Sequence, residues 1–154
     1  MQVKRSIAPL ALVAALTLAA NAEGAVYSGA GADDPKMSVF FSVKKKPGKP
    51  RKVRRFTAFN IAFTCADGSA GRTDPALPIE FPRPMRVEDR RFRGKERFTV
   101  ESTKGDWRVT MRVAGKLRRG GRANGILKLS GRPRSDVRCR SGKVPWKATR
   151  VERS

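Results

Sequence analysis

Histidine is absent from the sequence. Its absence excludes the Ser-His-Asp and Cys-His nucleophilic mechanisms, histidine-based metal hydrolysis and the commonest general base of enzymes. Acidic residues are scarce as well, with 13 against 35 lysines and arginines in 154 residues, so the formal net charge is +22. The sequence also lacks a Gly-x-x-x-x-Gly-Lys phosphate loop and a Gly-x-Gly-x-x-Gly turn, so the common nucleotide-binding motifs are not present.

Long apolar runs are missing after residue 22. The one apolar segment, Ile7–Ala20, follows a basic head with Lys4 and Arg5 and ends in Ala-x-Ala at residues 20–22. These features are typical of a cleaved signal peptide, and the alternative, a membrane anchor, would need a longer apolar segment. We predict a signal peptide over residues 1–22 and a secreted, extracellular or cell-envelope location. The mature chain would have a net charge of +20, no membrane span and no cofactor.

Cysteine occurs only at Cys65 and Cys139. Two cysteines without histidine cannot complete a closed zinc site, and no Cys-x-x-Cys motif indicates a redox centre. A single pair in an exported chain usually forms a structural disulfide. We therefore predict a Cys65–Cys139 bridge, with a metal pair or a redox centre as the alternatives.

Helical periodicity is also absent after residue 22, and the dominant pattern is alternation with a period of two, which is typical of β-strands. Strands are expected at Met37–Val43, Phe59–Cys65, Leu77–Phe81, Met85–Val87, Phe98–Val100, Trp107–Val113, Leu127–Leu129, Val137–Cys139 and Val144–Ala148. Turn sequences such as Asp67-Gly68 separate them. The pattern predicts an all-β fold, either an antiparallel β-sandwich of the immunoglobulin or jelly-roll kind or a small barrel.

A single β-sandwich domain is expected over residues 37–150. The Gly-rich stretch over 23–36 has no period and is interpreted as a flexible lead-in, and residues 151–154 as a tail. Phe56 is out of phase with the strand that follows it, which predicts a β-bulge near Arg55.

The basic residues form clusters that would suit the phosphates of an anionic polymer. The candidates with most weight belong to a loop interrupted by prolines and to a C-terminal hairpin, namely Lys44, Lys45, Lys46, Lys49, Arg51, Lys52, Arg138, Arg140, Lys143 and Lys147. Further clusters are Arg90, Arg91, Arg93 and Lys95, and Lys116, Arg118, Arg119 and Arg122. The alternative is that these cations are merely the solvated side of a half-buried sheet. Pro145 suggests that the last strand is an edge strand.

Aromatic residues are not interleaved with the basic clusters. Most aromatics fall on expected core faces, with Phe40 and Phe92 as possible exceptions, so base-stacking and sequence-specific nucleic-acid readout are not expected. Asp67 and Asp74 could approach a hard cation, but Arg72 between them opposes one and a plain Asp-Gly turn is preferred, so no metal site is expected.

The stretches F-N-I-A-F-T-C-A-D-G, R-V-T-M-R-V-A-G-K-L, R-A-N-G-I-L-K-L-S and V-R-C-R-S-G-K-V-P-W lie between residues 59 and 146. They resemble a group of secreted β-sandwich proteins of high-GC bacteria, which share Cys-x-Asp-Gly and a closing Cys-x-x-Gly-x-Val-x-Trp. Cys139, Gly142, Val144 and Trp146 match the closing element. The resemblance implies an exported β-sandwich with a Cys65–Cys139 bridge, and no established activity.

We predict a non-enzymatic exported domain with nonspecific affinity for anionic polymers, whether cell-envelope polymer, acidic polysaccharide or extracellular DNA. The alternative is a carbohydrate- or protein-binding module, including an inhibitor, whose specificity lies in its loops. An exposed aromatic platform around Phe40, Phe92 or Trp107 would support that alternative. Least favoured is a hydrolase that uses a carboxylate pair, because the available acids lie among arginines: Glu80, Glu88, Asp89, Glu96 and Glu101.

Overall fold

Twelve β-strands and no helix are found in the part of the chain that the structure, a computed structural model, describes: residues 24–102, 105–132 and 136–152. The strands are β1 (Ala25–Gly31), β2 (Ser38–Lys44), β3 (Lys52–Phe59), β4 (Ala62–Cys65), β5 (Ala70–Arg72), β6 (Ile79–Glu80), β7 (Met85–Arg86), β8 (Arg91–Val100), β9 (Trp107–Arg118), β10 (Arg122–Arg132), β11 (Cys139–Arg140) and β12 (Val144–Arg150). The described residues contain no helix able to cross a membrane. The predicted signal peptide lies outside these residues.

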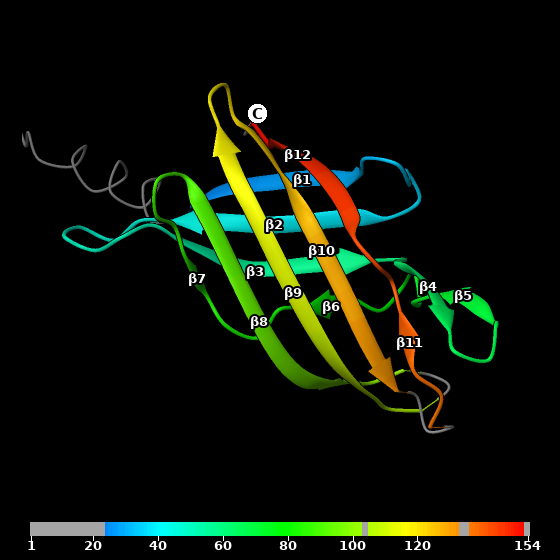
Figure 1. Ribbon diagram of the computed structural model, residues 1–154. Helices are drawn as coiled ribbons and strands as arrows, with labels where there is room; N and C mark the ends of the chain where they lie inside the picture. Colours follow the sequence, from blue (N-terminus) through cyan, green and yellow to red (C-terminus); the bar gives the residue numbers. More distant parts are fainter. Residues whose placement is uncertain (1–23, 103–104, 133–135, 153–154) are drawn as a thin grey trace, which may run out of the picture.

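The strands form one antiparallel sheet that folds back on itself without closing into a barrel. Its long path runs β8-β9-β10-β12-β1-β2-β3, with β6 and β7 on two parts of β3 and a branch β11-β4-β5 at the end of β10. Figure 1 shows β8, β9 and β10 crossing in front of β1, β2 and β3. The prediction of an all-β antiparallel fold is therefore confirmed.

The core lies between these two layers and contains the alternate residues that the sequence pattern marks as apolar. Val39 and Phe41 of β2, Met111 and Val113 of β9, and Trp146 of β12 are all buried. Phe41 is the centre of an aromatic cluster, with ring centroids 4.8 Å from Tyr27 and 5.7 Å each from Phe56, Phe92 and Trp146. Burial of rings of this size supplies much of the hydrophobic stabilisation of a small domain.

Two glycines make room for this cluster. Gly115 of β9 and Gly125 of β10 are register partners, flanked by Phe92 on β8 and Trp146 on β12, whose ring centroids lie 6.2 Å apart. A Cβ at Gly125 would come within 2.5 Å of the Trp146 ring, and it would also collide with the carbonyl oxygen of Ala114. The Phe92 and Trp146 rings occupy the space over these two positions because neither glycine has a side chain.

Gly125→Ala is expected to destabilise the fold by about 1–3 kcal/mol, because the added methyl group overpacks the core against backbone atoms that cannot rotate away. Urea unfolding followed by tryptophan fluorescence measures the effect. Gly142→Ala tests backbone strain without overpacking, because a Cβ at Gly142 meets nothing within 4 Å but the residue has a φ of 67°. Unchanged stability of Gly125→Ala would contradict the packing described here.

The lead-in prediction was wrong for Ala25–Gly31, which form β1 between β12 and β2. The stretch has little apolar alternation because Gly29 faces the backbone of β12, where a Cβ would collide with the carbonyl of Lys147. Tyr27 is its one large inward side chain. Pairing with neighbours on both sides, which cannot be seen in the segment itself, stabilises this strand.

The predicted strand Phe59–Cys65 is in fact two strands, because Asn60 adopts a φ of 56° and breaks the extended backbone between β3 and β4. The predicted bulge is confirmed, with a register shift opposite Phe40 to Ser42 and a φ of 53° at Arg55. The bulge turns Phe56 and Ala58 into the core, while Phe59 packs edge-on against Phe40.

The predicted C-terminal hairpin was also wrong. β11 and β12 both pair with β10, β11 with its last residues and β12 with its first, so they follow one edge of β10 in succession. The Ser141 hydroxyl accepts a hydrogen bond from the Leu129 N–H at 2.8 Å where the ladder is interrupted. β12 is an interior strand between β10 and β1. Pro145 is tolerated there because it lies near the start of the strand.

Candidate functional site

The outer side of β8, β9 and β10 is a continuous cationic surface. Odd-numbered residues of β8 and even-numbered residues of β9 and β10 point away from the core. Among these outward positions there is no acid, and eleven are basic: Arg91, Arg93, Lys95, Arg97, Arg108, Arg112, Lys116, Arg118, Arg122, Lys128 and Arg132. We call these eleven residues the β8–β10 cationic face.

The sheet register places cations of this face directly opposite one another. Lys95, Arg112 and Lys128 form one row across the three strands. Arg108 lies opposite Arg132 in another row. Neighbouring strands are about 4.8 Å apart, and like charges at opposed positions destabilise a sheet. The face is therefore electrostatically costly in the absence of a counter-anion.

Acidic partners do not relieve this cost. The four ion pairs found among residues 24–102, 105–132 and 136–152 join Arg55 to Glu80, Arg72 to Asp34, Arg83 to Glu96 and Arg86 to Glu88. None of them includes a residue of the β8–β10 cationic face. The guanidinium and ammonium groups of the face consequently remain available to an external anion, apart from Arg118, whose Nε donates to the Asn124 side chain at 2.9 Å.

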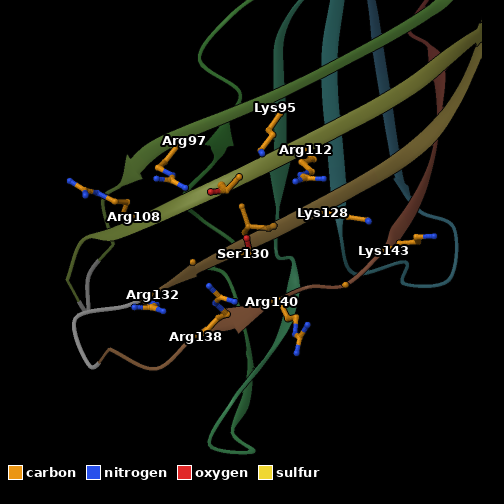
Figure 2. Close-up of a pocket in the computed structure, with 14 residues that line it drawn as sticks. Lys95, Arg97, Arg108, Arg112, Lys128, Ser130, Arg132, Arg138, Arg140 and Lys143 are labelled. Atoms are coloured by element: carbon orange, nitrogen blue, oxygen red, sulfur yellow. The ribbon is translucent and has the colours of Figure 1, made fainter.

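A hollow of about 740 Å³ lies over the lower half of this face. Figure 2 shows basic side chains from the three strands and from the segment around β11 gathered about it. Nine of its lining residues are basic and none is acidic: Lys95, Arg97, Arg108, Arg112, Lys128, Arg132, Arg138, Arg140 and Lys143. Six of the nine are arginines, which can hold phosphate, sulfate or carboxylate oxygens in pairs.

An apolar patch adjoins the hollow. Ala114 and Ile126 are opposed on β9 and β10, and Ile126 is 42% exposed. They line a second, shallower depression of about 600 Å³ together with Arg93, Lys143 and the row described above. The face therefore presents a small apolar contact surface among its cations.

The structure separates the predicted basic candidates into two groups. Arg138, Arg140 and Lys143 line the hollow, and Lys147 lies opposite Asn124 on the neighbouring strand. Lys44, Lys46, Lys49 and Lys52 surround a different, small cavity at the turn between β2 and β3, while Lys45 and Arg51 are exposed and do not line it.

The basic residues that the sequence favoured as polymer-binding candidates do not include those at the centre of the β8–β10 cationic face. Arg97, Arg108, Arg112, Lys128 and Arg132 line the hollow but belong to none of the sequence clusters. The sequence did contain a signal for these residues: basic residues occur singly between the apolar residues of the expected strands around Val109 and Leu127. The alternation of a strand places such residues on its outward side. Their assembly into rows depends on register, which the sequence alone does not specify.

The three aromatic residues considered for an exposed platform, Phe40, Phe92 and Trp107, do not lie together. Phe92 is buried in the core at 3% exposure, so its possible exposure was a wrong prediction. Phe40 is 41% exposed and packs against Phe59. Trp107 contacts Phe63 edge-on at 5.2 Å. These two rings line a partly apolar cleft of about 500 Å³ whose wall also contains Asp74 and Glu101.

Five of the candidate carboxylates take part in local ion pairs or hydrogen bonds. Glu80, Glu88 and Glu96 pair with arginines. Asp67 accepts hydrogen bonds from the hydroxyl and the backbone N–H of Ser69, and these bonds lower its pKa below the usual value. Asp74 accepts from the Ala76 N–H at 2.8 Å. Within the described ranges, no three His, Cys, Asp or Glu side chains are grouped so as to hold a metal ion.

The side chains of the β8–β10 cationic face are positively charged hydrogen-bond donors, a chemistry that complements anionic groups. The predicted Cys65–Cys139 disulfide is confirmed and joins β4 to β11 beside the hollow. Comparison of the chain with protein-family models, with curated proteins and with solved structures found no match. Function is therefore inferred from the geometry of the face.

Proposed function

We propose that the protein is an exported, non-enzymatic β-domain that binds anionic polymers along the β8–β10 cationic face. The observation behind this proposal is that eleven of the outward residues on three neighbouring strands are cations and none is an acid. A solvated sheet surface needs charge for solubility, but mixed signs serve that purpose without the repulsion of opposed like charges.

The geometry of the face suits a linear polymer. Same-side residues along a strand repeat every ~7 Å, and β9 presents outward positions from Arg108 to Arg118 over about 34 Å. An extended chain lying along the strands would meet successive cations, and release of its condensed counterions would drive binding. Such binding depends on the charge density of the polymer and is independent of its sequence. Envelope phosphate polymers, acidic polysaccharides and DNA all have the required charge.

Export accords with the disulfide, because bridges of this kind persist in oxidising compartments outside the cytosol. There the domain would meet polymers of the envelope or its surroundings. A surface that binds anionic polymers outside the cytosol would have an adhesive role. Adhesion of this kind needs no carboxylate pair or nucleophile.

Binding of the oxidised domain to fluorescently labelled heparin, polyphosphate and single-stranded DNA, with neutral dextran as the control, tests this proposal. Fluorescence anisotropy across a salt series should show binding to the anionic polymers. For six phosphate contacts to single-stranded DNA, the slope of log K against log salt should be about −4. Equal affinity for dextran, or a slope near zero, would refute the proposal.

A second candidate function is recognition of a neutral ligand in the cleft beside Trp107. The cleft volume of about 500 Å³ and its two aromatic rings are suitable for a small sugar or apolar molecule. A neutral oligosaccharide panel monitored by tryptophan fluorescence tests it, with Trp107→Ala as the control variant. No spectral change with any neutral ligand would exclude this alternative for the compounds in that panel.

A further inference from the structure

A separate, small cavity lies at the turn between β2 and β3, which Figure 1 shows extending beyond the rest of the sheet. The cavity has a volume of about 70 Å³. Five of its six lining residues are basic and the sixth is Pro50; the basic ones are Lys44, Lys46, Lys49, Lys52 and Arg54. It shares no residue with the hollow over the β8–β10 cationic face.

The local backbone brings these five cations together. Lys44 and Lys52 are directly opposed at the ends of β2 and β3, and Arg54 is opposed to Ser42 in the next row on that side. The Lys49 N–H donates to the Lys46 carbonyl at 3.1 Å, and Gly48 has a φ of 67°, which closes the turn. Lysines of the strands and of the turn therefore surround the same small space.

Arg54 provides an independent indication of a ligand. Its Nε is buried and has no hydrogen-bond partner among the described residues. A buried donor without a partner is costly, and a guanidinium cannot lose its charge to reduce that cost. Four lysines close to the same guanidinium add like-charge repulsion. An anion in the cavity would neutralise the lysines, and it would also accept from Nε once Arg54 turns this donor toward the cavity.

The size of the cavity limits the anion. One water molecule needs a cavity volume of about 10–15 Å³. The volume of about 70 Å³ therefore accommodates a few waters or one tetrahedral oxyanion. A tetrahedral oxyanion has several acceptor atoms that can be shared among an arginine and surrounding lysines, whereas a halide has a single centre. A polymer segment would not fit inside the cavity, although a phosphate or sulfate group that it bears could.

We propose that the cavity at the β2–β3 turn binds a single phosphate or sulfate group, held by Arg54 Nε and the surrounding lysines. This site is independent of the binding assigned to the β8–β10 cationic face. It gives the basic turn a role in recognising one tetrahedral group, while the face interacts with extended charge.

The test uses inorganic phosphate and sulfate as probes, with chloride at the same ionic strength as the reference. Thermal denaturation of the oxidised chain should show a saturable rise in melting temperature with phosphate or sulfate beyond that with chloride. The double variant Lys46→Gln/Lys49→Gln should weaken the binding by at least tenfold. The matched control Lys45→Gln/Arg51→Gln removes the same charge from the same turn and should leave the binding within about twofold.

Arg54→Lys examines the role of the buried donor without a change in net charge. Phosphate line broadening in ³¹P NMR should show weaker binding by about tenfold, because an ammonium cannot reproduce the buried Nε–H. An unchanged melting curve in the absence of phosphate would show that this variant folds. Equal effects of chloride and phosphate, or equal losses in the two double variants, would overturn the proposal whether or not the face binds polymers.

Discussion

Loss of the Cys65–Cys139 disulfide is expected to lower the free energy of unfolding by about 4 kcal/mol. The bridge closes a loop between residues 74 positions apart and so restricts the unfolded chain. It also joins β4 to β11, whose ladder has only two residue pairs within the described chain, whereas β9 and β10 share eleven. The high net positive charge of the chain also opposes the compact state through self-repulsion.

Urea unfolding of the oxidised wild type and of Cys65→Ser/Cys139→Ser measures this effect. Amide hydrogen exchange should also become fastest in β4 and β5, because these strands join the rest of the sheet through β11. A reducing agent should lower the stability of the wild type and leave the double variant unchanged. Unfolding midpoints that agree within experimental error would contradict the expected role of the bridge.

Removal of three charges from the central row and its neighbour is expected to weaken polymer binding by about 100-fold near 0.15 M salt. The variant is Arg97→Gln/Arg112→Gln/Lys128→Gln, whose three side chains all line the hollow. Each lost phosphate contact removes about 0.7–0.9 from the salt slope, and three such contacts at this salt concentration correspond to roughly two decades in affinity. The outward positions are exposed, so the fold should be unaffected or slightly stabilised.

The matched control is Lys36→Gln/Lys45→Gln/Arg51→Gln, which removes the same net charge from exposed positions that line neither the hollow nor the small cavity. This variant should bind within about threefold of the wild type, because charges farther than a Debye length of roughly 8 Å are screened. Equal losses in the two triple variants would mean that overall charge, and no particular surface, governs binding.

The fold class followed from the sequence because alternation directly encodes which side of a strand meets the core. Met111 and Val113, or Val39 and Phe41, were assigned inward correctly from spacing alone. The bulge at Arg55 also followed from the phase change at Phe56. The disulfide followed from the presence of one cysteine pair in a chain with an expected signal peptide.

What could not be predicted depends on contacts between strands distant in sequence. β1 has almost no apolar pattern, because its glycines face neighbouring backbone. Pro145 suggested an edge, yet β12 is an interior strand with the proline near its start. The cationic rows join β8, β9 and β10 through register, so residues such as Lys95 and Lys128 become neighbours of Arg112 only in the folded sheet.

The site prediction was limited for the same reason. Local density in the sequence favoured the turn from Lys44 to Lys52, where cations are consecutive. In the fold, the larger basic surface is built from single cations spaced along three strands. The density of basic residues along the sequence differs from their density on the surface, because strand pairing brings together residues that are far apart in the sequence.

The most direct test of the central claim is a backbone-amide NMR titration of the oxidised domain with a short anionic oligomer at 0.15 M salt. Binding along the β8–β10 cationic face predicts shift changes concentrated in β8, β9, β10 and residues 138–143, with little change in β1. Shift changes distributed evenly over all basic segments, or confined to the cleft beside Trp107, would contradict that claim.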